Sequence, residues 1–324
     1  MKFVLVGLAG LVVAVSAVAL MIGLGGPKDP TPVRSIEADV RKRDRSDAPA
    51  PLTFKARDGA ALAYRLYRSN EAQSAPLAAV LVHGSAGGGI NMHEVARALQ
   101  KAGIDSIAPD MRGHGDSGTT GDIGYVGQLE DDVTDLLAEC DRLGLSKRRI
   151  IIGHSAGGGF ILRQPGKPLW SRFEGAILLA PFAGIDAPIV RPDGGWAGVG
   201  VPRIMGLMLA NAVGVHAFDG LPTLAFGVSE QAKSRVTSQY SFRLMRNFAP
   251  LRDWKSAINQ LSGPVHVLVG TADELFFADR YAETFGDKAK VQLIPNVSHM
   301  GITGEPAALS AVVAAARDIA GSAR

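Results

Sequence analysis

The sequence contains a single cysteine, Cys140, among 324 residues, and no stripe of lysine or arginine follows residue 50. One cysteine excludes an intrachain disulfide framework and a metal site built from several cysteines. The formal net charge is only +3, so a nucleic-acid partner finds no support. We expect no nucleic-acid partner, no metal and no other cofactor, because the chemistry indicated below needs side chains alone.

Charge of either sign is absent from residues 3–24, which read FVLVGLAGLVVAVSAVALMIGL. A helix of this length, rising about 1.5 Å per residue, would extend about 33 Å, the thickness of a bilayer core. We therefore expect residues 1–25 to be a single-pass anchor and the protein to be located at a membrane. A signal peptide cleaved after Ala17-Val18-Ala19, which would leave an exported protein, is the alternative. A buried core helix is less favoured, because the run is uniformly apolar.

The rest of the chain divides by composition into a linker and one domain. Residues 26–50 are rich in proline, glycine and charge, which favours a tether. Residues 51–324 are enough for one large α/β domain.

Within this domain, short apolar runs alternate with segments of helical spacing. This alternation predicts a mostly parallel central sheet with helices on both faces. The expected strands are 52–56, 62–67, 78–83, 105–109, 149–153, 175–179, 265–269 and 291–294, and the expected helices are 91–102, 126–143, 156–163 and 306–320.

The alternation breaks between about residues 185 and 262, which we interpret as an inserted cap. Methionine and aromatic residues recur there on a leucine and glycine background. Loops at the carboxyl ends of parallel strands surround the site in such folds. We therefore expect the cap to contact an acyl chain through Met205, Met208 and Phe218, although ordinary packing would explain each residue equally well.

The strongest motif is Gly153-His154-Ser155-Ala156-Gly157, a G-x-S-x-G sequence. It follows a predicted buried strand and opens a predicted helix, as a nucleophilic serine on a strained turn requires. Glycines are needed on either side, where a Cβ would collide with neighbouring elements. This context favours Ser155 as a nucleophile over an incidental serine in a glycine-rich turn.

A serine hydroxyl needs a general base, and the base needs an acid that orients it. Asp273 and Glu274 follow one late strand, and His299 follows the last one. This order of serine, acid and histidine predicts His299 as the base and Asp273 as the acid, with Glu274 as the alternative acid.

An acyl-transfer site also needs two backbone N–H groups for the developing oxyanion. Ala156, directly after the nucleophile, would supply one. The glycine-rich loop after the strand at 78–83 would supply the other, and we expect Ser85 to donate, with Ala86 as the alternative.

Together with the segment Asp110-Met111-Arg112-Gly113-His114-Gly115-Asp116-Ser117, these motifs make the chain resemble the α/β-hydrolase superfamily over residues 50–320. It looks closest to the lysophospholipase, monoacylglycerol-lipase and serine-aminopeptidase-like group. The resemblance implies the α/β-hydrolase fold, the triad Ser155, Asp273 and His299, and the oxyanion donors Ser85 and Ala156. The glycines 87–89 stand where an acidic residue is often found in monoacylglycerol lipases, and this departure weakens the transfer of that family's substrate to this chain.

These observations predict a serine hydrolase that cleaves carboxylic esters, with a lipid-like or a medium or long acyl group, through an acyl-enzyme. An aminopeptidase of the same fold is one alternative. A non-catalytic, membrane-tethered binding module is another, because a fold does not fix a function.

Overall fold

An eight-stranded sheet with the order β1-β2-β4-β3-β5-β6-β10-β11 forms the centre of the molecule. The computed structural model describes residues 2–69, 77–192 and 194–322. β1 and β2 pair antiparallel, as do β2 and β4, and all other neighbours are parallel, so the predicted mostly parallel sheet is confirmed. The strands are β1 Leu52–Lys55, β2 Ala61–Tyr67, β3 Ala78–Val82, β4 Asp105–Pro109, β5 Arg149–His154, β6 Gly175–Leu179, β10 Val265–Gly270 and β11 Lys290–Ile294.

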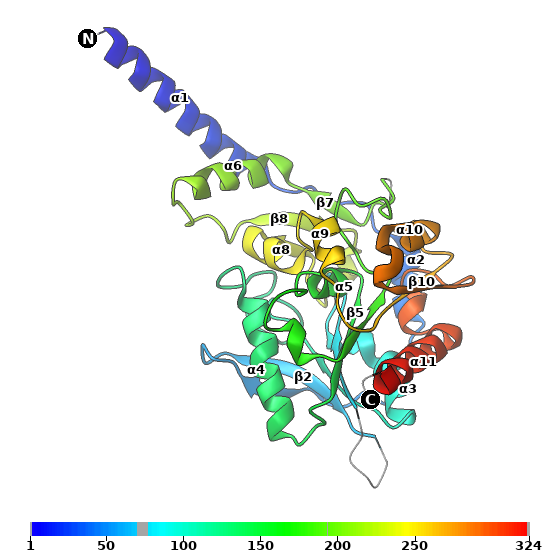
Figure 1. The fold of residues 1–324 in the computed structure, drawn as a ribbon. Helices are drawn as coiled ribbons and strands as arrows, with labels where there is room; N and C mark the ends of the chain where they lie inside the picture. The colour runs from blue at the N-terminus through cyan, green and yellow to red at the C-terminus, as the bar shows by residue number, and fades with distance from the viewer. Residues whose placement is uncertain (1, 70–76, 193, 323–324) are drawn as a thin grey trace.

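Burial explains why the apolar runs form the inner strands. Every residue of β3, β4, β5, β6 and β10 is buried, because helices cover both faces of the sheet. Two helices contact each other over one face, and two others lie over the opposite face (Figure 1). The first pair is α3 His93–Lys101 and α11 Pro306–Ser322, and the second pair is α4 Gln128–Arg142 and α5 Ala156–Ile161.

Between β6 and β10 the chain forms a separate layer beyond the carboxyl ends of the parallel strands (Figure 1). A small antiparallel sheet of three strands forms its middle. This layer is the cap, and it covers the edge of the sheet from which Ser155 emerges. Its elements are β7 Ala197–Val199, α6 Val201–Ala212, β8 Pro222–Phe226, α7 Glu230–Lys233, β9 Gln239–Ser241, α8 Phe242–Phe248 and α9 Trp254–Asn259.

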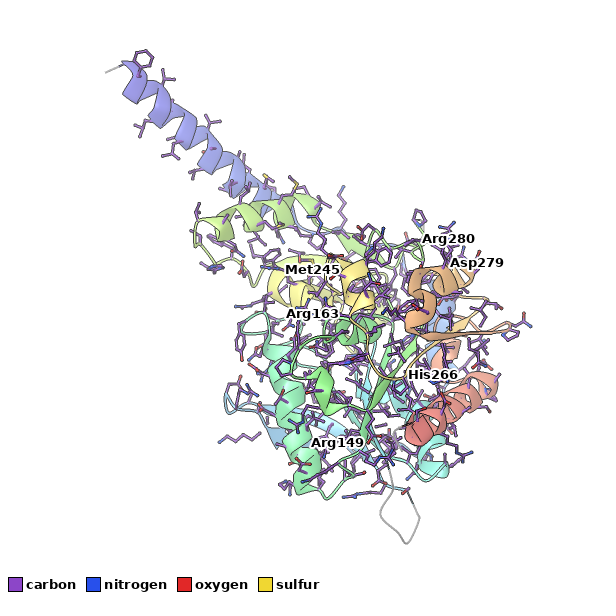
Figure 2. All side chains as sticks on the ribbon, in the orientation of Figure 1. Arg149, Arg163, Met245, His266, Asp279 and Arg280 are labelled. Atoms are coloured by element: carbon purple, nitrogen blue, oxygen red, sulfur yellow. The ribbon has the colours of Figure 1, made fainter. Side chains whose placement is uncertain are left out.

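The N-terminal apolar run forms helix α1, Lys2–Leu24, whose far end projects from the domain (Figure 1). The expected membrane span is not found: within the described residues, no helix reaches the length and hydropathy that crossing a membrane requires. Part of the apolar sequence packs within the protein instead. Ile22 is buried with Leu207, Ala210 and Phe242, and Met245 of α8 borders this cluster (Figure 2).

Residues 26–50 differ from the extended tether that their composition predicts. Helix α2, Arg34–Arg41, packs Ile36 and Val40 against the core of the domain, together with its N-cap residue Val33. These three positions follow helical spacing, and that spacing explains why the segment folds back onto the domain. The linker is thus part of the folded unit.

Candidate active site

Ser155 lies on the turn between β5 and α5, with φ at 51° and ψ at −116°. Non-glycine residues rarely adopt this conformation, and such strain is typical of functional sites. A Cβ on Gly153 would lie 2.6 Å from the carbonyl oxygen of Gly157, and a Cβ on Gly157 would lie 2.5 Å from that of His83. The two glycines therefore allow the turn, as the motif predicts.

His299 and Asp273 come together although 26 positions separate them along the chain. The Nδ1–H of His299 donates to Oδ2 of Asp273 over 2.9 Å, and each residue is only 2% exposed. The other oxygen, Oδ1, accepts the backbone N–H groups of Leu275 and Phe276 at 2.8 and 2.9 Å. The carboxylate is thus held on both sides and fixes the orientation of the imidazole ring.

Glu274, the alternative acid, contacts the backbone of His299 instead of its ring. Its Oε2 accepts the backbone N–H of His299 over 2.9 Å, and its Oε1 accepts the hydroxyl of Ser35 over 2.8 Å. Glu274 therefore positions the loop that holds His299 and ties α2 to that loop.

Two opposing effects act on the pKa of His299. Burial lowers the pKa, while the charge of Asp273, its hydrogen bond and the charge of Glu274 raise it, and the net shift is upward from the ordinary value. The ring therefore accepts a proton more readily than a free histidine does.

His154 is a site residue that the sequence analysis did not assign. Its Nε2–H donates to the backbone carbonyl of His299 over 3.1 Å, and the two rings lie 4.8 Å apart. Burial, with the charge of His299 second, lowers the pKa of His154 well below the ordinary value, so this ring stays neutral. Its position inside the G-x-S-x-G motif was the available signal.

Ser155, His154 and His299 line one pocket of about 830 Å³. Within the described residues, no hydrogen bond joins the Ser155 hydroxyl to the His299 ring. Such bonds are often long before substrate binds and tighten in the complex. Nor do these residues include a group of three or more histidine, cysteine, aspartate or glutamate side chains placed to hold a metal ion.

The glycine-rich loop after β3 passes beside Ser155, and two of its residues are hydrogen-bonded to aromatic side chains of the cap. The N–H of Ala86 donates to the hydroxyl of Tyr240 over 3.0 Å, so it is already engaged. The Ser85 hydroxyl is held by the indole N–H of Trp196 over 2.8 Å. The N–H of the alternative donor, Ala86, therefore has a partner within the protein.

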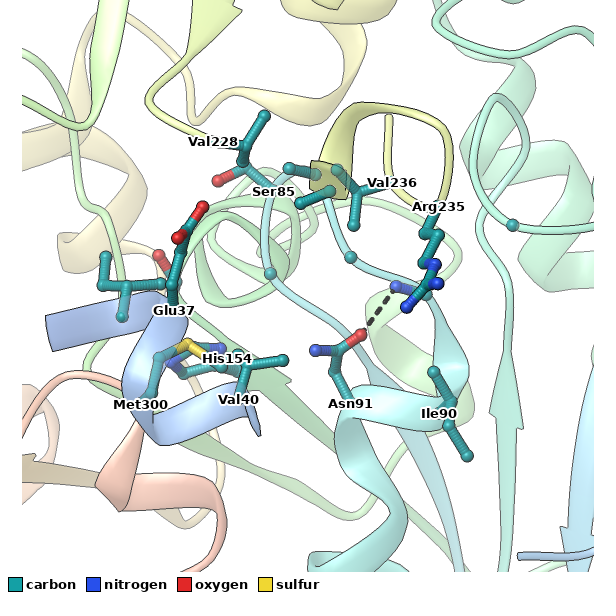
Figure 3. Close-up of a pocket in the computed structure, with 18 of the residues that line it drawn as sticks. Glu37, Val40, Ser85, Ile90, Asn91, His154, Val228, Arg235, Val236 and Met300 are labelled. Carbon is teal, nitrogen blue, oxygen red and sulfur yellow. Dashed lines mark hydrogen bonds between the residues drawn. The ribbon is translucent and has the colours of Figure 1, made fainter. Parts of the chain in front are cut away.

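Helix α2 and the cap form the walls of the pocket. Figure 3 shows Glu37 and Val40 of α2 facing Val228 and Val236 of the cap across the cavity. Tyr240 of the cap does not line the pocket, but its hydroxyl accepts the N–H of Ala86 in the glycine-rich loop. The segment predicted to be a tether therefore supplies one side of the candidate site.

The expected acyl contacts of the cap through its methionines and Phe218 are wrong. Met205, Met208 and Phe218 are 52%, 56% and 47% exposed, and none of them lines the pocket. Helix α6, which carries the two methionines, packs against α1 through its other face. The apolar lining comes instead from Ile36, Val40, Ile90, Trp196, Val228, Val236, Leu275 and Met300.

A model of the alpha/beta hydrolase family matches residues 79–312. The chain belongs to the alpha/beta hydrolase family. The resemblance predicted from its motifs is therefore confirmed. The match begins within β3 and includes the turn with Ser155, Asp273 and His299.

Among known proteins, this alpha/beta hydrolase is similar to the non-heme chloroperoxidase CPO-A1 of Kitasatospora aureofaciens, with 32% identity over 124 residues. That stretch is 38% of this chain and 42% of the relative, so less than half of the relative's length is matched. A monoglyceride lipase from Saccharomyces cerevisiae has a TM-score of 0.61 at 16% identity, covering 86% of this chain and 97% of that one. A monoacylglycerol lipase from Paleococcus ferrophilus has a TM-score of 0.56 at 18% identity, covering 80% and 98%. At these identities the structural likeness shows the fold alone.

Proposed function

We propose that this alpha/beta hydrolase cleaves carboxylic esters through an acyl-enzyme formed on Ser155. The observation that supports this most is the pairing of His299 with buried Asp273 in the same site as the strained Ser155 turn. These are the parts that nucleophilic acyl transfer needs: a nucleophile, a base and a group that orients the base.

In the proposed reaction, Oγ of Ser155 attacks the ester carbonyl carbon while its proton passes to Nε2 of His299. The backbone N–H groups of Ser85 and Ala156 stabilise the oxyanion of the tetrahedral intermediate. His299 then returns the proton to the leaving alkoxide, and the alcohol departs. Water attacks the acyl-enzyme, gives its proton to His299 and releases the acid, after which Ser155 regains its proton.

The pocket wall supports an acyl group of medium length. Side chains of Ile36, Trp196, Val228 and Leu275 give it an apolar surface, and a volume of about 830 Å³ exceeds what a short acyl group needs. Each additional buried methylene contributes up to about 0.8 kcal/mol, so kcat/KM is expected to rise along the acyl chain. These apolar side chains come from α2, the cap and the loop after β10, and none of them belongs to α6.

The aminopeptidase alternative needs an acidic anchor for the substrate amine. Of the acids that the sequence places in the cap, Asp186, Asp219 and Glu230 do not line the pocket, and Asp193 lies outside the described residues. Turnover of aminoacyl-4-nitroanilides in preference to 4-nitrophenyl esters would favour the peptidase. A purely binding role would leave both unhydrolysed.

Labelling with a fluorophosphonate probe tests the proposed function directly. The probe is expected to modify Ser155 stoichiometrically, because it phosphonylates serines that a neighbouring base activates. Peptide mass spectrometry identifies the modified residue, and heat-denatured protein is the control. Absence of labelling, or labelling only at another serine, would contradict an activated Ser155.

The pH dependence of ester hydrolysis is expected to follow the protonation of His299. Protonated His299 cannot accept the proton of Ser155, so kcat/KM should rise with pH. The midpoint should lie above about 6.5, the ordinary histidine pKa, since the net shift is upward. Initial rates between about pH 5 and 9, with circular dichroism as a check on folding, measure the profile. A profile that is flat from about pH 5 to 8 would rule out His299 as the base.

A further inference from the structure

The pocket carries more positive than negative charge. Four arginines and three carboxylates line it, while His154 stays neutral. Some of these charges are compensated or hydrated: Arg41 pairs with Glu37 over 2.8 Å, and Arg235 and Asp116 are exposed to solvent. The charged lining consists of Arg41, Arg45, Arg65, Arg235, Glu37, Asp110 and Asp116.

Two nitrogen atoms of the Arg45 guanidinium, Nε and Nη2, are buried and have no hydrogen-bond partner among the residues that the structure describes. Burial lowers the pKa of Arg45, and the neighbouring charges of Arg43 and Arg65 lower it further, against the opposing effect of Glu94. A guanidinium keeps its charge in proteins, so this cation stays in the wall incompletely compensated.

Arg65 on β2 adds a second poorly paired cation. Its Nε is also buried without a partner, and its Nη1 lies 3.9 Å from Oδ1 of Asp110. That carboxylate is already engaged by backbone N–H groups, from Gly89 over 2.6 Å and from Asp116 over 3.1 Å. Asp110 therefore serves mainly the loops around it and compensates the charge of Arg65 only weakly.

The chain on both sides of Arg45 is fixed to the domain. Arg43 donates to the hydroxyl of Thr303 over 2.7 Å, and Asp47 contacts Nε2 of His93 over 2.9 Å. The backbone N–H of Ala48 donates to the carbonyl of Arg45 over 3.1 Å, which closes a turn. A guanidinium held on an anchored turn is preorganised for a ligand and loses little entropy on binding.

We propose that Arg45 and Arg65 form an anion subsite in the pocket, so that the preferred esters bear a carboxylate remote from the scissile bond. The substrate class is then that of half-esters of dicarboxylic acids, and this assignment rests on the proposed ester hydrolysis at Ser155. An excess of one positive charge matches a monoanion. Arginine binds carboxylates strongly through charge-assisted, often bidentate, hydrogen bonds.

Matched esters test the subsite. The probes are the 4-nitrophenyl half-esters of adipic, suberic and sebacic acids, each compared with its neutral monoamide. Shorter half-esters are unsuitable, because attack by their own carboxylate makes them hydrolyse spontaneously. In the wild-type protein the carboxylate form is expected to have a kcat/KM at least about tenfold higher than the amide at one chain length. That chain length reports the distance from Ser155 to the arginines.

The variants Arg45→Gln and Arg65→Gln are expected to reduce the ratio of carboxylate to amide kcat/KM by about ten- to a hundredfold. Arg34→Gln is the control, because Arg34 lies on the same segment, is exposed and does not line the pocket. The ratio of carboxylate to amide kcat/KM is compared because partial misfolding would lower the two values by the same factor. Inhibition of the wild-type protein by adipate, compared with hexanoate, gives a readout that needs no variant, and adipate is expected to bind more tightly.

The outcomes separate the two proposals. If neither member of a pair is hydrolysed, ester hydrolysis itself is wrong. If both are hydrolysed with the amide equal or preferred, and adipate binds no better than hexanoate, the subsite does not exist. If Arg45→Gln leaves the ratio unchanged, Arg45 serves Glu94 and the surrounding structure, and the subsite is overturned in the same way.

Discussion

Replacing Ser155 with alanine is expected to lower kcat for 4-nitrophenyl ester hydrolysis by about 10⁴- to 10⁶-fold while the fold is retained. The variant removes one hydroxyl, and with it the only atom that forms the proposed acyl-enzyme. The backbone strain at residue 155 is expected to stay the same, because alanine meets the same steric limits at a φ of 51° as serine does. Initial rates measure the loss of turnover, a thermal melt checks that the fold is retained, and fluorophosphonate labelling tests whether the reactive hydroxyl is gone.

Ser85→Ala is the matched control for this variant. Ser85 lines the same pocket, and the proposed mechanism uses its backbone N–H, which alanine keeps. Only the hydrogen bond from Trp196 is lost, so we expect less than about a tenfold effect on kcat. Near-normal turnover by purified Ser155→Ala, or equal losses in the two variants, would remove Ser155 from the nucleophile's role.

The central sheet and the Ser155 turn could be predicted because each depends on local sequence. A parallel strand covered on both faces is a continuous apolar run, which makes β3, β5 and β10 recognisable. The glycines beside Ser155 reflect contacts within one turn and with the adjacent strand. Each of these patterns can be recognised from a few neighbouring residues.

The walls of the pocket could not be predicted in the same way, because they depend on contacts between distant segments. The composition of residues 26–50 favours a tether, yet Ser35 reaches Glu274 and Asp39 accepts the hydroxyl of Ser298. Likewise, the methionines of α6 fit an acyl site by composition. Which face of α6 is covered depends on α1, about 180 residues earlier in the chain.

The choice between Ser85 and Ala86 shows the same dependence. Adjacent residues of one loop are equivalent by sequence, and each has a backbone N–H that could face the substrate. Tyr240, 154 residues later, engages the N–H of Ala86 and breaks the equivalence. Its hydroxyl also contacts Nε2 of His114, which gives a structural role to a histidine of the Asp110–Ser117 segment.

Asp273→Asn is expected to lower kcat by about 10³- to 10⁴-fold, and the reason lies in the hydrogen bonds around the carboxylate. Oδ1 of Asp273 accepts two backbone N–H groups, from Leu275 and Phe276. An asparagine would keep its carbonyl oxygen there and turn its NH₂ group toward Nδ1 of His299. Nδ1 would then have to accept, the ring proton would move to Nε2, and Nε2 could no longer take the proton of Ser155.

Glu274→Gln provides the comparison that distinguishes the two neighbouring acids. The carbonyl oxygen of glutamine can still accept the backbone N–H of His299, which is the contact that Glu274 makes in the structure. The weaker bond to Ser35 and the lost charge are therefore expected to reduce kcat by less than about tenfold. Single-turnover and steady-state rates of both variants, each corrected for its folded fraction, decide the matter. A larger loss in Glu274→Gln than in Asp273→Asn would transfer the acid's role to Glu274, and the buried bond from His299 to Asp273 would then be structural.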